Sequence, residues 1–364
     1  MTGRRKVVIA GATGVVGLSC VERFAANGDW DVVALARRGI DPRPGVRHIS
    51  ADLRDEDGLE ETLAALGPVS HLVYAAVYEK PGLIAGWTER DQMETNDRML
   101  RNLVGALQKQ GALQHVTLLQ GTKAYGAHLH AIPVPAREGL PRDPHENFYW
   151  LQEDFIRQEA ARTGLRWTIW RPQLILGGAI GVAMNLIPVI GVFGALCREL
   201  DRPFGFPGGP DFVWEAVDAR ILAEAIEWAA DAPEASGEIF NITNGDVFSW
   251  RDSWSSIAEA LGLEPVADAP LELGTWLPAM QAEWEALARR HGLREPRMAA
   301  MIGQSHFYAD RCFATGRSDP LPARLVSTIK LRKAGFGAVC DTADTFRYWL
   351  GRLAAERYLP DVKG

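Results

Sequence analysis

The sequence predicts an α/β fold in which a doubly wound parallel sheet is joined to a smaller, mainly helical C-terminal lobe. Short apolar runs alternate with helix-like stretches from residue 6 to residue 170. A glycine-rich turn directly follows the first apolar run, and the alternation fades beyond residue 175. This order of elements is typical of helices that cross over between parallel strands.

The alternating elements are closely spaced. We expect strands at residues 6–10, 31–36, 48–53, 71–76, 114–120 and 166–170. The helices expected between them span residues 15–26, 55–66, 89–110 and 147–163. Right-handed crossovers place the carboxyl ends of parallel strands along one edge of the sheet, where ligands bind. The loops that follow the strands are therefore the predicted location of the chemistry.

The domain boundaries follow from where the alternation stops and resumes. Residues 1–175 form the predicted sheet domain, and about 212–245 return to it, because a helix is expected at 217–230 and a strand at 238–243. Residues 176–211 and 246–364 form the predicted substrate-binding lobe, whose longer part is mostly helix-like and rich in Trp and Arg.

Composition and charge are those of an ordinary globular protein that can bury a large core without disulfides or metals. The chain has 364 residues, of which 47% are hydrophobic and 23% are charged. Its net charge of −7 argues against a general nucleic-acid binder, because neutralising phosphates requires a basic surface. The same balance gives no reason to expect binding to anionic lipid.

Two further observations bear on where the protein resides. Residues 172–197 carry no charge and could span a bilayer by length, but prolines and glycines would interrupt a lipid-exposed helix. A buried strand followed by an apolar segment that lines a pocket is the simpler interpretation, so we expect no membrane partner. The four cysteines are scattered along the chain, which suits a reducing compartment and predicts a cytoplasmic protein.

The glycine-rich turn reads Gly11-Ala-Thr-Gly-Val-Val-Gly17, and it lies between the first strand and the first helix. Glycine lets the backbone approach a pyrophosphate, and the helix N-terminus offers unpaired N–H groups to that anion. This context predicts a Rossmann-type dinucleotide site rather than a purely structural turn. The residues expected to bind the dinucleotide here are Gly11, Thr13, Gly14, Val15, Val16 and Gly17.

The end of the second strand indicates which nicotinamide cofactor is used. An NAD enzyme usually presents an acidic residue there, whereas this chain has Arg37 and Arg38. Two guanidinium groups suit a 2′-phosphate and therefore predict NADP(H), although a solvated basic loop is the plainer alternative. Asp52 and Leu53, after the third strand, are expected near the adenine edge.

Reduction of a carbonyl system needs a hydrogen-bond donor for the oxygen that gains charge, and tyrosine is the usual donor in this class of fold. The usual arrangement is Tyr-x-x-x-Lys on one helix. None of the seven tyrosines has a lysine four residues on, and Tyr149 has Glu153 at that spacing. The site is therefore either inactive or supplied with a lysine from elsewhere. Lys123 follows the fifth strand, where chemistry is expected.

At these residues the chain resembles the progesterone 5β-reductase/iridoid synthase (PRISE) family of extended short-chain dehydrogenases/reductases. The resemblance rests on the glycine turn, the paired arginines, the Lys123-x-Tyr125 segment and the Asn147-Phe-Tyr-x-x-x-Glu-Asp154 segment. It covers nearly the whole chain, continuing through Arg171-Pro172, Met184–Leu186, Phe240–Phe248, Trp250 and Ser327–Phe336. The plant members often have a second tyrosine where this chain has Trp150, which bears on substrate shape.

The resemblance implies an NADPH-dependent 1,4-reductase of enones and enals, with a small apolar α,β-unsaturated carbonyl compound as substrate. It implies Tyr149 as the catalytic tyrosine and Lys123 as its partner. The further cofactor contacts expected are Ala75, Ala76, Val77, Gln120, Lys123, Tyr149, Pro172, Leu174 and Ile175. No nucleic acid is expected as a partner, and a homodimer is left open.

Several alternatives stay open from the residues alone. A carbonyl reductase would use the same tyrosine, and a sensor that binds NADP(H) without turnover would need neither Tyr149 nor Lys123. His128 and His130 have no cysteine nearby, so no metal site is expected. An apolar pocket and ordinary core are equally compatible with Val182–Leu186, Phe204, Phe206, Phe212 and Trp214.

Overall fold

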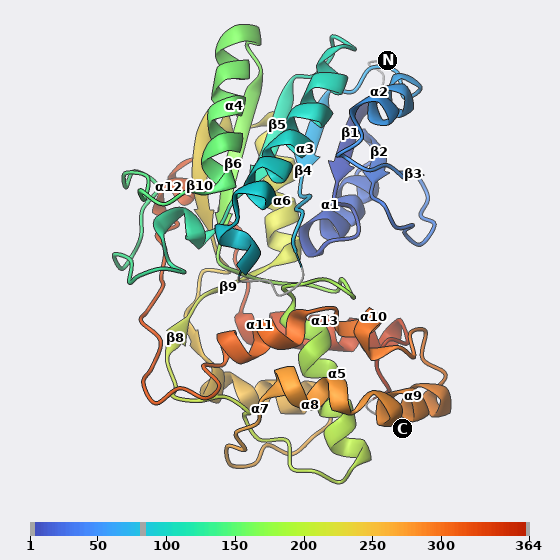
Figure 1. Ribbon diagram of the computed structural model, residues 1–364, viewed down its shortest axis with the longest axis vertical. Coiled ribbons are helices and arrows are strands. Elements are labelled where there is room, and N and C mark those ends of the chain that lie inside the picture. Colours follow the sequence, from blue (N-terminus) through green and yellow to red (C-terminus); the bar gives the residue numbers. More distant parts are fainter. Residues whose placement is uncertain (1–3, 81–84, 362–364) are drawn as a thin grey trace. The chain divides into compact units, whose positions relative to one another are not determined.

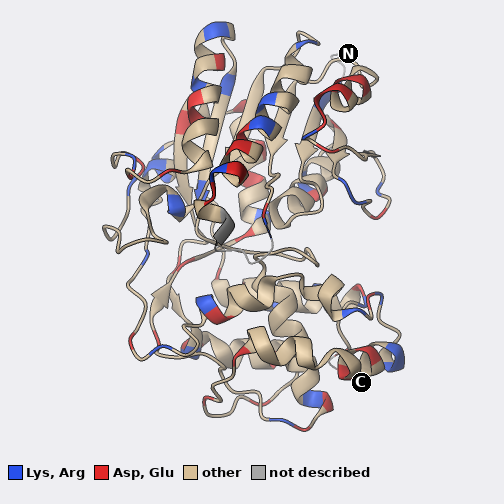
Figure 2. Cartoon of the chain, viewed as in Figure 1, with Lys and Arg blue, Asp and Glu red and all other residues tan. Residues whose placement is uncertain are grey.

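The computed structural model describes residues 4–80 and 85–361, which divide into two compact units (Figure 1). The first unit comprises residues 1–173, 219–242 and 326–337. The second unit comprises residues 174–218, 243–325 and 338–364. Charged residues of both signs are interspersed over the helices of the first unit (Figure 2).

The first unit is built on a seven-stranded sheet with the order β10-β6-β5-β4-β1-β2-β3, in which all neighbours are parallel. This confirms the predicted doubly wound sheet. The direction of strand addition reverses between β1 and β4, so the edge above these two strands is the switch point where such sheets bind ligands. The strands are β1 Arg5–Ala10, β2 Trp30–Leu35, β3 Val46–Ile49, β4 His71–Tyr74, β5 His115–Leu119, β6 Arg166–Pro172 and β10 Glu238–Ile242.

Helices cover the sheet as the apolar patterning requires. The larger ones are α1 Val15–Ala26, α2 Glu56–Ala64, α3 Arg90–Gln108, α4 Phe148–Thr163 and α6 Ala219–Asp231. Helix α1 packs against α6, while α3 contacts both α2 and α4. The core beneath α2, α3 and α4 includes Val8, Leu100, Leu103 and Ile156, and each of these side chains is fully or almost fully buried. Burial of this continuous apolar layer fixes which strand ends are brought together.

The third strand differs from the prediction. It spans Val46–Ile49 rather than residues 48–53, so Asp52 and Leu53 lie in the following turn. The turn closes where Asp55 N donates to Asp52 O at 3.1 Å. The Asp55 carboxylate then accepts from Gly58 N at 3.2 Å and caps α2. Asp55 is thus the N-cap of α2, and residues 52–55 form the turn before this helix.

The second unit contains two short strand pairs and the remaining longer helices. Strand β7 Leu174–Leu176 pairs with β9 Ala216–Asp218, and β8 Val213–Trp214 pairs with β11 Phe248–Ser249. The helices are α5 Leu186–Glu199, α7 Trp250–Ala260, α8 Leu273–Ala279, α9 Gln281–His291, α10 Met298–Ile302, α11 Ser305–Cys312 and α13 Thr342–Ala355.

Aromatic packing forms the interior of the second unit. The rings of Phe204 and Phe206 lie 5.0 and 5.4 Å from that of Trp254, and both phenylalanines are buried. These two candidate pocket residues therefore belong to the core. The uncharged stretch 172–197 provides β7 and most of α5, and the last two residues of this helix are Arg198 and Glu199. None of the helices among the described residues is long and apolar enough to cross a membrane.

The division into units differs from the predicted boundaries in one instructive place. Residues 326–337, expected in the helical lobe, belong to the first unit. Val326 forms a bridge with Ala136, and Lys330 Nζ donates to Ile239 O at 2.8 Å in the edge strand β10. Asn241 Nδ2 adds bonds of 3.1 and 3.2 Å to Ala136 O and Ser327 O. These side-chain contacts have no counterpart in a periodic sequence pattern.

Candidate active site

The glycine turn has a backbone that only glycine fits at its first position. Gly11 has a φ of +80°, and a Cβ there would lie 2.5 Å from the Ala75 carbonyl oxygen after β4. A Cβ on Gly17 would collide with the Gly11 carbonyl in the same way. Gly14 is the N-cap of α1 and provides no side-chain hydrogen bond to the first turn. The turn therefore forms a backbone cradle at an uncapped helix N-terminus, which is suited to an anion.

The paired arginines stand at the end of β2, as predicted. Both Arg37 and Arg38 are exposed, and their carbonyls are anchored by Ser50 Oγ at 3.3 Å and His48 Nε2 at 3.0 Å. These two bonds tie the backbone after β2 to residues 48 and 50. An exposed pair of this kind can bind a phosphate bidentately.

Asp52 has a partner that the sequence analysis did not single out. Arg54 Nη2 lies 2.6 Å from Asp52 Oδ2, and this hydrogen bond lowers the pKa of the carboxyl to about 2. Arg37 also contributes, more weakly, to that lowering. Leu53 is buried, and its carbonyl accepts from Asn102 Nδ2 at 3.0 Å. The turn after β3 thus adds a third arginine to the two after β2.

The segment after β4 is held in place by a buried asparagine of α3. Asn96 Oδ1 accepts from Tyr78 N at 2.8 Å, and its Nδ2 donates to Tyr78 O at 2.9 Å. Ala75 and Ala76 are half-buried, while Val77 is 40% exposed. The backbone of Ala75 and Ala76 lies beside Gly11 at the switch point of the sheet, and Val77 follows in the chain.

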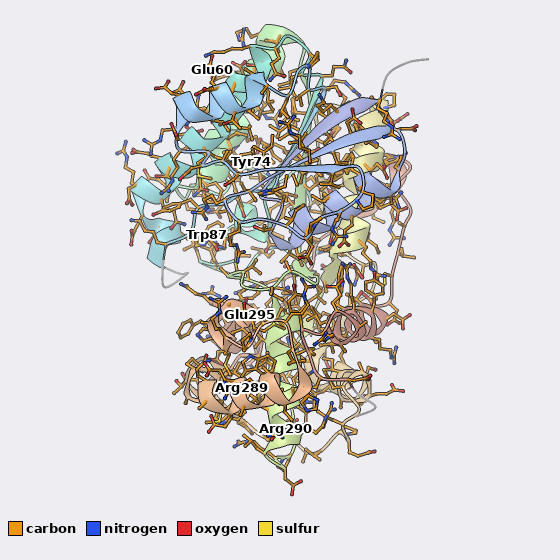
Figure 3. The ribbon with its side chains drawn as sticks, turned by 90° about the vertical axis from the view of Figure 1, so that its right-hand side faces the viewer. Glu60, Tyr74, Trp87, Arg289, Arg290 and Glu295 are labelled. Carbon is orange, nitrogen blue, oxygen red and sulfur yellow. The ribbon has the colours of Figure 1, made fainter. Side chains whose placement is uncertain are left out.

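Lys123 and Tyr149 meet at a residue that sequence reasoning missed. The Lys123 ammonium lies 2.7 Å from the ring centroid of Trp87, which belongs to a short 3-10 helix at Ala85–Thr88 (Figure 3). The Tyr149 ring contacts the same indole edge-on, with centroids 5.9 Å apart. A Cβ on Gly121 would lie 3.6 Å from the Tyr149 hydroxyl, which places the phenol beside the turn that carries Lys123. No motif in the sequence distinguishes Trp87 from the other tryptophans.

The Tyr149 phenol is a protonated donor at neutral pH. Burial raises its pKa, the nearby Glu79 carboxyl raises it further, and Arg171 opposes both. Burial also raises the pKa of Glu79, while the Lys123 ammonium lowers it. The arrangement combines an amine, a carboxyl and a neutral phenol around one indole. A neutral phenol in a dry site can stabilise a developing oxyanion without first losing its own proton.

Glu153 occupies the position at which a Tyr-x-x-x-Lys motif would have its lysine. It is buried and pairs with Arg142 at 3.0 Å, Arg157 at 3.1 Å and Arg171 at 3.7 Å. Burial alone would raise its pKa, but hydrogen bonds from Arg142 and Gln120 hold it below the usual value. Glu153 therefore organises arginines around α4.

Gln120 and Tyr125 are engaged by the protein itself. Gln120 Nε2 donates to Glu153 at 3.1 Å, and its Oε1 accepts from Arg171 Nε at 2.9 Å. The Tyr125 hydroxyl donates to Asn241 Oδ1 at 2.7 Å, and the side chain is buried. The Gln120 amide, expected at the cofactor, thus supports the helix that bears Tyr149.

The remaining predicted contacts are divided between the units. Pro172 ends β6 in the first unit, whereas Leu174 and Ile175 lie in β7 of the second. His128 and His130 belong to no group of three or more metal-ligating side chains within residues 4–80 and 85–361.

Comparison with known proteins decides the family. The model of the PRISE-like Rossmann-fold domain matches residues 50–309. The chain belongs to the PRISE family. Among its relatives is an (S)-8-oxocitronellyl enol synthase of Camptotheca acuminata, 32% identical over 80% of this chain and 79% of that protein. The 3-oxo-Delta(4,5)-steroid 5-beta-reductase of Arabidopsis thaliana is 29% identical over 97% and 92%.

Solved structures show how widely this PRISE protein's fold is shared. The UDP-glucose 4-epimerase of Thermotoga maritima covers 96% of this chain and 99% of its own, with a TM-score of 0.67 and 14% identity. The Bordetella bronchiseptica enzyme WbmH, solved with NAD+, gives a TM-score of 0.65 at 15% identity, over 96% and 98%. At these identities the likeness establishes the extended short-chain dehydrogenase/reductase fold alone.

Proposed function

We propose that the protein reduces the C=C bond of a small α,β-unsaturated carbonyl compound with NADPH. The observation that carries the proposal is the meeting of Lys123 and Tyr149 on Trp87, beside the turn at Gly121 that follows β5. The family relatives support it, because one is named as an enol synthase and another as a reductase of a 3-oxo-Δ4,5-steroid. Both names fit addition of hydride to a double bond conjugated with a carbonyl.

The residues present fit NADPH. The turn from Gly11 to Gly17 forms a cradle that a Cβ would fill, at a helix N-terminus without a side-chain cap. Arg37 and Arg38 would hold the 2′-phosphate, and the loop of Ala75, Ala76 and Val77 would flank the dinucleotide. When bound, the cofactor supplies the hydride.

The chain's own part in the reaction is to hold and polarise the substrate. The Tyr149 hydroxyl would donate a hydrogen bond to the substrate carbonyl oxygen as negative charge develops there. Its raised pKa keeps the proton on the phenol oxygen while the enolate forms. Lys123 would provide a positive charge at the same place and would bind ribose hydroxyls nearby. A proton from solvent at the α-carbon then completes the saturated carbonyl.

The test is incubation of the protein with NADPH and a small cyclic enone, followed by product analysis. A saturated ketone supports the proposal, whereas an allylic alcohol would assign carbonyl reduction instead. NADPH binding without any turnover would favour a sensor. Tyr149→Phe is expected to abolish most of the activity, and the control Tyr348→Phe, at a 40% exposed tyrosine of the second unit, is expected to retain it.

A further inference from the structure

The first turn of α4, which carries Tyr149, is capped by Asn147. The Asn147 backbone is extended, and its Oδ1 accepts a hydrogen bond from Tyr149 N at 3.0 Å. An asparagine in this place satisfies a helix donor that would otherwise have no partner in the helix. The backbone position of Tyr149 is therefore tied directly to the side chain of Asn147.

The nitrogen of the same Asn147 amide determines which ring nitrogen of a neutral His145 carries the proton. Asn147 Nδ2 lies 3.1 Å from His145 Nε2. Because an amide nitrogen only donates, His145 Nε2 must accept and therefore carries no proton. The ring proton then resides on Nδ1, which faces Asp143 Oδ1 at 2.6 Å. Asp143, His145 and Asn147 form one directed chain of hydrogen bonds that ends at the Tyr149 amide.

We propose that His145 is a positioning residue for Tyr149 and that a proton on its Nε2 loosens the start of α4. We name Asp143, His145 and Asn147 the capping relay. The role in catalysis rests on the proposed function, because it acts through the tyrosine assigned there. The relay itself is a property of the fold and can be tested without turnover.

The physical reason is a conflict between donors. Protonation places an N–H on His145 Nε2 opposite the N–H groups of Asn147 Nδ2, across 3.1 Å. Rotating the Asn147 amide would remove that conflict, but it would also turn Oδ1 away from Tyr149 N. Either outcome weakens the cap, and the second residue of α4 then loses its fixed position.

Two further histidines, His128 and His130, contact the capping relay. Burial raises the pKa of Asp143, but hydrogen bonds from His145 and His130 hold it below the usual value. His130 Nε2 occupies the other Asp143 oxygen at 2.6 Å, and the His128 ring contacts His145 edge-on at 4.9 Å.

Helix α4 presents Trp150 to the same histidine. The two ring centroids are 6.2 Å apart, and Trp150 Nε1 donates to His145 O at 3.1 Å. Arg142 and Arg171 lie over that indole at 5.0 and 6.0 Å, where they are paired with Asp154 and Glu153. Asp143 and Asn147 are thus the groups whose side chains hydrogen-bond the His145 ring nitrogens.

Hydrogen exchange of the first turn of α4 tests the relay directly. Exchange at residues 147–152, corrected for the intrinsic effect of pH, is expected to rise roughly fivefold in the wild-type protein between pH 8 and pH 5.5. His145→Gln places a non-titrating acceptor near the Nε2 position, so its corrected exchange should not change with pH. His130→Gln is the matched control, because His130 bonds to the same carboxylate without touching Asn147, and it should keep the wild-type response.

A second variant keeps the test decisive if His145→Gln does not fold. Asn147→Ser retains a capping oxygen but has no amide to meet His145, so its exchange should also be independent of pH. A flat wild-type profile, or a response retained in Asn147→Ser, would overturn the relay.

With NADPH and enone, kcat rather than KM for NADPH should fall over the same pH range. Absence of any enone reduction would count against the proposed function and leave the exchange result standing.

Discussion

The ammonium of Lys123 rests on the indole of Trp87, 2.7 Å from the ring centroid, and the Tyr149 ring meets the same indole at its edge. A cation on an aromatic face is attracted by the negative face of the ring. Trp87 thus fixes the two polar side chains of the site without belonging to either of the segments that supply them.

Trp87 should therefore matter for the rate. We expect Trp87→Leu to lower kcat about tenfold, because Lys123 loses the surface that holds its ammonium. Trp87→Phe keeps an aromatic face and should cost much less. Steady-state kinetics at saturating NADPH measure the difference, and equal losses in the two variants would show that the indole is only a spacer.

Removal of the Tyr149 hydroxyl should be the most damaging single change. We expect Tyr149→Phe to lower kcat by roughly 10² to 10³, the usual cost of losing an oxyanion donor. Because burial raises the pKa of Tyr149, ionisation of the phenol should cause no loss of wild-type activity up to pH 10. A pH profile of kcat/KM checks this, and a decline between pH 8 and 10 that disappears in the phenylalanine variant would contradict it.

Preference for NADPH over NADH should depend on the arginines after β2. In Arg37→Ala/Arg38→Ala, KM for NADPH should rise about tenfold to a hundredfold, because the 2′-phosphate loses two charge-assisted hydrogen bonds. KM for NADH should hardly change. Arg90→Ala, at an exposed arginine of α3 paired with Glu94, is the control. A parallel loss with both cofactors would place the arginines elsewhere than at the 2′-phosphate.

Two buried histidines should make the fold sensitive to acid. Burial lowers the pKa of His71 to about 4 and that of His115 to about 3, and their rings lie 6.0 Å apart in β4 and β5. The unfolded chain binds these protons more readily, with a pKa near 6.5, so stability is full above that pH and falls as pH drops toward the folded values.

Between pH 6.5 and pH 5, each histidine should reduce the free energy of unfolding by up to about 2 kcal/mol. Urea unfolding at pH 7.5 and pH 5 measures the loss. His115→Asn should remove part of this pH dependence, whereas the exposed His291→Gln should not. If His115→Asn kept the full pH dependence, the titrating groups would lie elsewhere.

The features of the fold and the site that depend on local sequence patterns could be predicted from the sequence. The alternation of β1 to β6 with helices, the Gly11 turn and the Arg37–Arg38 pair are all short-range signals, and the structure has each of them at or near the expected residues. The family resemblance placed Lys123 and Tyr149 at one site although they lie 26 positions apart (149 minus 123).

What the sequence could not provide depends on contacts between distant segments. Trp87 lies in a short 3-10 helix without a motif, and nothing local indicates that its indole faces Lys123. Glu153 and its arginines come from three separate segments, so their pairing appears only after folding. Strand β3 ends at Ile49 rather than Leu53, and residues 52–55 form a turn closed by the hydrogen bond from Asp55 N to Asp52 O.

Because residues 326–337 belong to the first unit, no single cut of the chain separates the two units. That segment contacts the edge strand β10 through Ser327 and Lys330, so the first unit is complete only when residues 326–337 have joined it. During synthesis the strand β10 is covered only after residues 326–337 have emerged. A shortened protein that stops at residue 325 would retain every strand of the sheet and yet leave β10 open to pairing with other chains.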